Sequence, residues 1–128
     1  MPIHLDWDTT LPNVIYYTFE GRWTWTEFLT TFEKELQIVK ARDMARYDVI
    51  TDFLQSAVLP KGPGIAHVYS VFRRYPPNWG ITVIVNRSML IRAMVDIGSK
   101  LHPDTRGHYY TTDTVEAARR LIQENRSD

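Results

Sequence analysis

The stretch Trp79–Val85, with the sequence WGITVIV, carries apolar residues at both alternating sets of positions. Ile81, Val83 and Val85 fall on one side of an extended chain, and Ile84 falls on the other. A strand that is apolar on both faces belongs in the middle of a covered sheet, most often the parallel sheet of an α/β protein. Pro76-Pro77 ends the preceding element, because proline cannot donate a helical hydrogen bond. Residues 86–88, Asn-Arg-Ser, predict a turn into a helix.

Four further strands are predicted from runs of β-branched and aromatic residues that end at turn-forming residues. They cover residues 3–7, 14–19, 47–54 and 109–112. A short loop separates the first two runs, which are therefore expected to form a hairpin.

Helices are predicted where apolar residues recur at spacings of three and four. The first begins after Thr24, which forms a capping-box pattern with Glu27. A second covers about residues 65–74 and ends at the double proline, and the last opens at Asp113. A third is capped by Ser88 and ends near residue 101. Its inward-facing stripe is expected to be Leu90, Ile91, Met94, Val95, Gly98 and Leu101.

The predicted order of elements is β-β-α-β-α-β-α-β-α, in one domain that spans residues 1–128. Consecutive strand–helix units require right-handed crossovers, so we expect a mainly parallel five-stranded α/β sheet whose first strand is antiparallel. A flavodoxin-like doubly wound sheet is the alternative. The N-terminal hairpin and the lack of a phosphate-binding loop after the first strand favour the first architecture.

Composition narrows the functional classes. Fifteen basic and fifteen acidic side chains cancel, so no overall field attracts nucleic acid or an anionic membrane. The chain has no Cys, which excludes disulfides, thiolate catalysis and thiolate metal sites. The first residues lack the features of a signal peptide, and no apolar run approaches the roughly 20 residues needed to cross a bilayer. We therefore expect a cytoplasmic protein.

Two passages of the sequence resemble a known family. The strand 49–53, Val-Ile-Thr-Asp-Phe, is apolar and ends in an Asp followed by an apolar residue. Residues 76–78, Pro-Pro-Asn, lead through Trp79 into Gly-Ile-Thr-Val-Ile-Val and a helix. Both passages, and the order of elements, resemble the SpoIIAA-like fold shared by anti-sigma-factor antagonists and STAS domains. The resemblance covers nearly the whole chain as architecture, and it implies a non-enzymatic regulatory module that binds a partner protein.

The chain departs from that family at one motif. STAS antagonists carry an Asp-Ser-Ser/Thr-Gly type signature at the start of the helix after the Asp-bearing strand, and its hydroxyl is the phosphorylation switch. The corresponding segment here, residues 59–64 (Leu-Pro-Lys-Gly-Pro-Gly), contains no Ser or Thr, and Ser56 lies several residues earlier. The resemblance therefore implies the fold and the regulatory role, but not the switch.

Ligands of parallel α/β sheets usually bind at the carboxyl ends of the strands, where loops and helix N-termini converge. The residues predicted to meet there suit a small anionic ligand, such as a nucleotide or a lipid-like anion, or the polar rim of a protein interface. They are Arg22, Trp23, Asp52, Ser56 and Arg87.

Ordinary structural roles compete with this prediction. Asp52 could instead accept backbone N–H bonds of the following loop, and the two arginines could be solvated loop charges. Trp23 is expected to face away from the core, which leaves a contact role and a structural role equally open.

No catalytic residue, metal site or cofactor motif is predicted. The four histidines lack the paired spacing of zinc ligands, and no Ser has the Gly-x-Ser-x-Gly context of a nucleophile. Asp6 and Asp8 fall on one side of an extended strand, but a solvated pair is a simpler interpretation than an acid/base dyad.

Two functional hypotheses follow. The first is a regulatory module that binds a partner protein, or a second copy of itself, through its many aromatic residues. The second is a receptor for a small ligand at the carboxyl edge of the sheet. An enzyme is the least favoured class, because the sequence does not reveal the pKa-tuned pair that catalysis would require.

Overall fold

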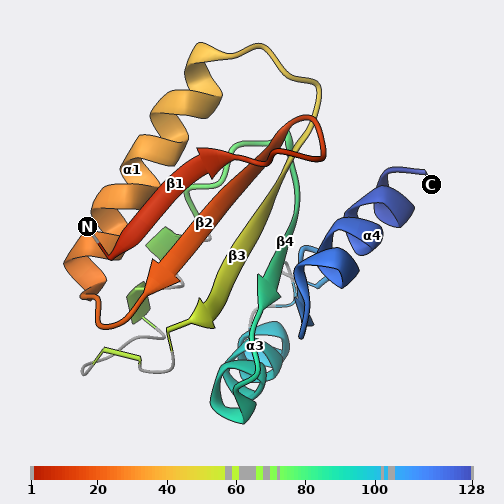
Figure 1. Ribbon diagram of the computed structural model, residues 1–128. Coiled ribbons are helices and arrows are strands. Elements are labelled where there is room, and N and C mark those ends of the chain that lie inside the picture. The colour runs from red at the N-terminus through yellow and green to blue at the C-terminus, as the bar shows by residue number, and fades with distance from the viewer. Residues whose placement is uncertain are drawn as a thin grey trace.

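The computed structural model describes residues 2–56, 59–60, 66–67, 70–71, 73–101, 103 and 106–127. The sheet and the main helices are shown in Figure 1. The strands are β1 (Ile3–Trp7), β2 (Val14–Glu20), β3 (Tyr47–Gln55), β4 (Trp79–Val85) and β5 (Tyr109–Thr112). The helices are α1 (Trp25–Ala41), α3 (Met89–Leu101) and α4 (Val115–Arg126).

The five strands form one sheet in the order β1-β2-β3-β4-β5. β1 pairs with β2 in the antiparallel direction, and the remaining neighbours are parallel. The predicted hairpin and the mainly parallel sheet are therefore confirmed. Because the strand order follows the sequence, each crossover after β2 leads to the adjacent strand.

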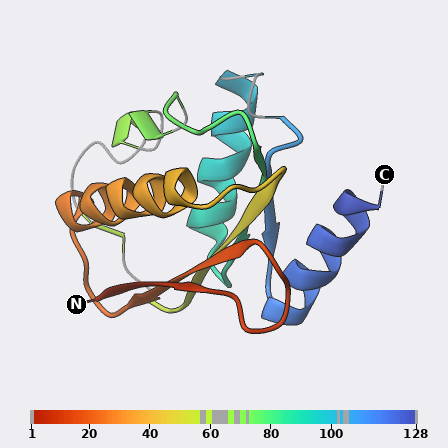
Figure 2. The ribbon, with the colours of Figure 1, turned by 90° about the horizontal axis from the view of Figure 1, so that it is seen from above.

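Helices cover both faces of this sheet. Seen from above, α1 and α3 lie on one face and α4 lies on the opposite face (Figure 2). The first face packs Tyr17 and Val49 in its core, and the second packs Ile50 and Val83 with α4. Ile84 belongs to the face that α1 and α3 cover. Helices therefore cover both faces of β4, as its two-sided apolar pattern predicts.

Helix α1 begins as the capping-box pattern predicts. The Thr24 Oγ1 accepts a hydrogen bond from the Glu27 backbone N–H at 3.1 Å, and the Glu27 Oε1 accepts one from the Thr24 N–H at 3.0 Å. The buried side of the helix includes Trp25, Phe32 and Glu35. A Glu in a buried stripe needs partners, because an isolated carboxylate is costly to remove from water.

Helices α3 and α4 differ in detail from the predictions. Leu90 is 60% exposed, because the buried side of α3 centres on Ile91 and the preceding residue lies about 100° around the helix. Helix α4 is capped by Thr114 and not by Asp113. The Thr114 Oγ1 accepts the Ala117 N–H at 3.1 Å, which satisfies a donor of the first turn.

The predicted helix 65–74 can be compared with the structure only in part. Residues 66–67 and 70–71 are helical, and residues 73–74 form a turn. Its other positions lie outside the described residues, as does the side chain of Leu101 in the predicted stripe of α3.

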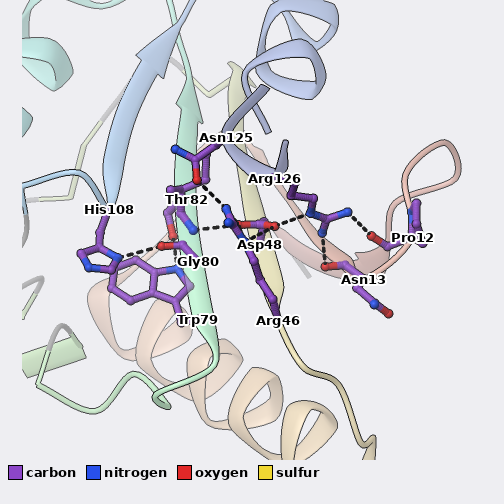
Figure 3. Close-up of polar contacts among 11 residues, drawn as sticks. Pro12, Asn13, Arg46, Asp48, Trp79, Gly80, Thr82, His108, Asn125 and Arg126 are labelled. Atoms are coloured by element: carbon purple, nitrogen blue, oxygen red, sulfur yellow. Dashed lines mark hydrogen bonds and ion pairs between the residues drawn. The ribbon is translucent and has the colours of Figure 1, made fainter. Parts of the chain in front are cut away.

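The carboxylate of Asp48 joins α4 to the sheet at the amino ends of β3 and β4 (Figure 3). Its side chain has no solvent exposure, and it pairs with Arg46 at 2.9 Å and with Arg126 at 2.7 Å. The Ile81 N–H donates to the same carboxylate at 2.8 Å. Arg126 also donates to the backbone oxygens of residues 12 and 13, in the loop between β1 and β2. A buried charge with this many partners is satisfied and holds four segments together.

Gly80 lies directly against this ion pair. A Cβ at that position would overlap the Arg46 Nε and the Asp48 Oδ1. The pairing register of β3 and β4 also shifts here, between Tyr47 and Val49. Glycine at position 80 therefore lets the Arg46–Asp48 ion pair approach the backbone of β4 closely.

Gly80→Ala is expected to lower the free energy of unfolding by about 2–4 kcal/mol, because the added methyl displaces the buried Asp48 carboxylate from its partners. Chemical denaturation measures the loss. Arg46→Ala is the matched control, with an expected loss of about 1 kcal/mol, since Arg126 and the Ile81 N–H still hold Asp48. A wild-type denaturation midpoint for Gly80→Ala would contradict this packing.

Candidate functional site

Two of the five predicted site residues meet, but in the core. The Trp23 Nε1–H donates to the Ser56 Oγ at 3.1 Å, and the Ser56 hydroxyl donates to the Gly21 carbonyl at 2.8 Å. Trp23 is only 5% exposed and its ring packs edge-on against Phe19 and Trp25. The expectation that Trp23 faces away from the core is therefore wrong, because its N–H has a buried acceptor and its ring has apolar neighbours. This contact ties the turn before α1 to the end of β3.

Asp52 belongs to the opposite face of the sheet. Its carboxylate accepts the Tyr16 hydroxyl at 2.5 Å and the Leu54 backbone N–H at 2.9 Å, and Tyr16 packs with the core under α4. The second bond is the loop-capping role considered for this residue. Arg22 and Arg87 are exposed. The structure thus unites Trp23 with Ser56, and it directs Asp52 to the other side of the sheet.

The Asp6 and Asp8 side chains do not form a carboxylate pair. Asp8 is paired with Arg119 of α4 at 2.7 Å, whereas Asp6 is exposed. Burial raises the pKa of Asp8, but hydrogen bonds from Arg119 and from the Leu11 backbone N–H outweigh it and leave the pKa below its usual value. Asp8 therefore anchors the N-terminal half of α4 as an ionised group.

A cavity of about 130 Å³ lies between the sheet and helices α1 and α3. Side chains of β2, β3, β4 and β5 form its floor. Eight of its eighteen described lining residues are aromatic, and the lining consists of Tyr17, Trp23, Trp25, Phe28, Phe32, Thr51, Phe53, Leu59, Val71, Tyr75, Thr82, Ile84, Ile91, Met94, Val95, Gly98, Ser99 and Tyr109. Small apolar cavities of about this volume can bind small apolar molecules.

One residue of this lining has a buried polar atom without a partner. Trp25 is the first residue of α1 and is 9% exposed, and its Nε1–H has no hydrogen-bond acceptor. It is the one such buried side-chain atom found in the described part of the chain. Leaving a buried donor unpaired costs about 1–3 kcal/mol. The indole N–H of Trp25 is therefore a buried donor whose hydrogen bond is not made.

A buried carboxyl group lies between α1 and the sheet, bonded to the lining residue Tyr17. Glu35 of α1 has no solvent exposure, and it accepts hydrogen bonds from the Tyr17 hydroxyl and, at 3.2 Å, from the Tyr47 hydroxyl. Burial raises the pKa of Glu35 to about 7, even though both tyrosine bonds act in the opposite direction. Burial also raises the pKa of Tyr17, and the neighbouring Glu35 adds to the effect. Because Tyr17 lines the cavity and bonds to Glu35, only this one residue separates the Glu35 carboxyl from the cavity.

The sequence contained a signal for Glu35 that a count of apolar positions overlooks. Glu35 follows Phe32 by three residues and precedes Val39 by four, so it falls on the buried stripe of α1. A charged residue at such a position must find partners inside the protein.

A second group of rings flanks the cavity near β4 and β5. Tyr75 stacks on Trp79 with ring centroids 3.9 Å apart, and Trp79 stacks on His108 at 4.8 Å. Burial raises the pKa of Tyr109 well above its usual value, and a hydrogen bond with Tyr75 offsets part of that rise. The tyrosine hydroxyls are therefore protonated at neutral pH and act as neutral donors or acceptors.

Comparisons with family models, with curated proteins and with solved structures each found no match for this chain. In the described residues, no group of three His, Asp or Glu side chains is placed to hold a metal ion. No helix in the same part of the chain is long and apolar enough to cross a membrane.

Glu35 is expected to make the folded protein less stable as pH rises. Below about pH 4.5 the carboxyl is protonated in both states. Between about pH 4.5 and 7 the unfolded chain loses this proton while the folded chain keeps it, so the free energy of unfolding falls by about 3 kcal/mol in total. Above pH 7 the contribution is constant.

Chemical denaturation of wild type and Glu35→Gln across this range measures the effect. Glu35→Gln removes the titrating group and keeps hydrogen bonds to both tyrosines, so its stability should lack this fall. Glu33→Gln, on the exposed side of the same helix, is the matched control. Parallel stability curves for wild type and Glu35→Gln would contradict the raised pKa.

The two indole groups should differ in what their N–H contributes. Trp23→Phe and Trp25→Phe remove similar ring volume, but only the Trp23 N–H has an acceptor. Trp23→Phe is therefore expected to be more destabilising by about 1 kcal/mol. In a Ser56→Ala background, which removes the acceptor, the difference should shrink towards zero in a double-mutant cycle. Equal losses in the wild-type background would contradict the assignment.

Proposed function

We propose that this protein binds a small, mainly apolar molecule with one oxygen acceptor in the cavity between the sheet and helices α1 and α3. The observation that carries the proposal is the unpartnered Nε1–H of Trp25 in an aromatic lining. A ligand oxygen would satisfy this donor, and the rest of the ligand would lie against apolar side chains. The proposed role is binding and not catalysis.

The cavity volume indicates the size of the ligand. An engineered cavity of about 150 Å³ lined by apolar side chains stays dry and binds benzene, and the cavity here measures about 130 Å³. A single aromatic ring or a short hydrocarbon chain therefore fits. A neutral carbonyl or hydroxyl oxygen suits the site better than a carboxylate, because Glu35, which is bonded to the lining residue Tyr17, would repel a second negative charge once it ionises.

This proposal moves the expected ligand site away from the carboxyl edge of the sheet. Arg22 and Arg87 are exposed, and Asp52 is engaged on the face that α4 covers. The lipid-like part of the sequence hypothesis, an apolar molecule with a polar end, is the part that the cavity supports.

A second candidate function is the regulatory, protein-binding module that the STAS-like resemblance implies. One observation favours it. Three large apolar side chains of α3 face solvent, with exposed fractions of 85% for Met89, 60% for Leu90 and 46% for Ile97. Contiguous exposed apolar residues of this kind often mark interaction sites.

Acetophenone and ethylbenzene test the first proposal, because they share a shape and differ in a carbonyl oxygen. Both should raise the melting temperature of the wild-type protein, since they bind only the folded state. Acetophenone should gain about 1 kcal/mol, or roughly fivefold in affinity, from the Trp25 N–H. In Trp25→Phe, the ratio of the two affinities measured by calorimetry should fall by about that factor.

Trp23→Phe is the control for this ratio, because the Trp23 N–H is already bonded to Ser56. Val95→Phe places a larger side chain in the cavity and should abolish the binding of both compounds. The proposal is contradicted if neither compound shifts the wild-type melting temperature, or if Val95→Phe binds them as well as wild type does.

A further inference from the structure

Helix α3 carries apolar residues on its outer face as well as on its inner face. Ile91, Met94 and Val95 line the cavity, whereas Met89, Leu90 and Ile97 are among the most exposed large apolar residues of the described chain. Spacings of four residues place Met89, Ala93 and Ile97 in one row, and Leu90 lies beside it. We name these four residues, Met89, Leu90, Ala93 and Ile97, the outer row of α3.

The charges beside the outer row are arranged in a self-complementary way. Arg92 and Asp96 are both exposed and form no ion pair with another described residue. They lie on either side of residue 94, at equal sequence distances from it. If two copies of α3 pack antiparallel around a two-fold axis near residues 93–94, Arg92 of each copy faces Asp96 of the other.

The same axis brings the apolar residues into register. Leu90 of one copy then lies opposite Ile97 of the other, and Ala93 lies near the axis, where a small side chain allows the two helices to approach closely. A partner with unrelated sequence would have to supply both patterns independently. A second copy supplies them automatically, because the two-fold relation repeats every contact.

We propose that this protein forms a two-fold homodimer through antiparallel packing of the outer row of α3. The position of the helix permits this, because α3 lies at the periphery of the molecule (Figure 1). The net charge of zero means that two copies do not repel one another overall. A 13-residue helix extends only about 20 Å, so the interface is small and the dissociation constant is expected in the micromolar range.

Sedimentation velocity of the full chain, from low micromolar to several hundred micromolar, tests the proposal. Wild type should shift from monomer to dimer over this range. Leu90→Lys should raise the dissociation constant at least about tenfold, because it places a charge in the apolar contact. A strictly monomeric wild-type protein would overturn the proposal, and would leave the outer row to a different partner.

Charge reversal tests the antiparallel register. Arg92→Asp alone and Asp96→Arg alone each create two like-charge contacts, so each should raise the dissociation constant by about tenfold. An equimolar mixture of the two variants should regain dimerisation, because the first copy then presents only acidic groups and the second only basic groups. The double variant Arg92→Asp/Asp96→Arg should also regain it.

Arg120→Asp, at an exposed position of α4, is the control for a change in net charge and should dimerise like wild type. Circular dichroism of each variant distinguishes loss of folding from loss of association. Dimerisation that survives Leu90→Lys and both single reversals would place the interface elsewhere and overturn the proposal. Failure of the mixed variants to associate would overturn it as well.

Discussion

The buried carboxylate of Asp48 is the interaction on which the arrangement of layers depends. Arg46, Arg126 and a backbone N–H of β4 surround it, so removing it from water is compensated by three partners. Arg126 joins the C-terminal end of α4 to this carboxylate, and Arg119 joins the N-terminal half of α4 to Asp8. The two ion pairs hold α4 over one face of the sheet, which lets β4 be apolar on both sides.

The opposite face is organised differently, and this difference locates the site. Its buried polar groups include the Glu35 carboxyl, which accepts hydrogen bonds from two tyrosine hydroxyls, and two indole N–H groups, of which Trp23 has an acceptor and Trp25 does not. Satisfied buried groups stabilise a fold, whereas an unsatisfied one is a cost that folding alone does not explain. The unpaired N–H belongs to Trp25, which lines the cavity, and this combination is the basis for proposing a ligand.

Helix α3 connects the two proposals. Its inner residues, such as Met94 and Val95, line the cavity, and its outer residues, such as Leu90 and Ile97, form the proposed dimer surface. A helix that contacts a ligand on one side and a second copy on the other can couple the two equilibria, since any change in its position alters both contacts. Such coupling is the physical form that a regulatory role would take in this fold.

The sequence by itself determined the type, order and approximate limits of the strands, the hairpin and the cap of α1, because each depends on a local period or a local hydrogen bond. It placed Glu35 on a buried stripe without showing what would surround it. Only the tertiary structure decided that Arg126 reaches Asp48 across 78 positions and that Trp23 reaches Ser56 across 33. The period of apolar residues predicts which way a side chain faces, but not which distant residue it contacts. Whether an indole N–H finds an acceptor depends on such a distant contact, so only the tertiary structure distinguishes Trp23 from Trp25.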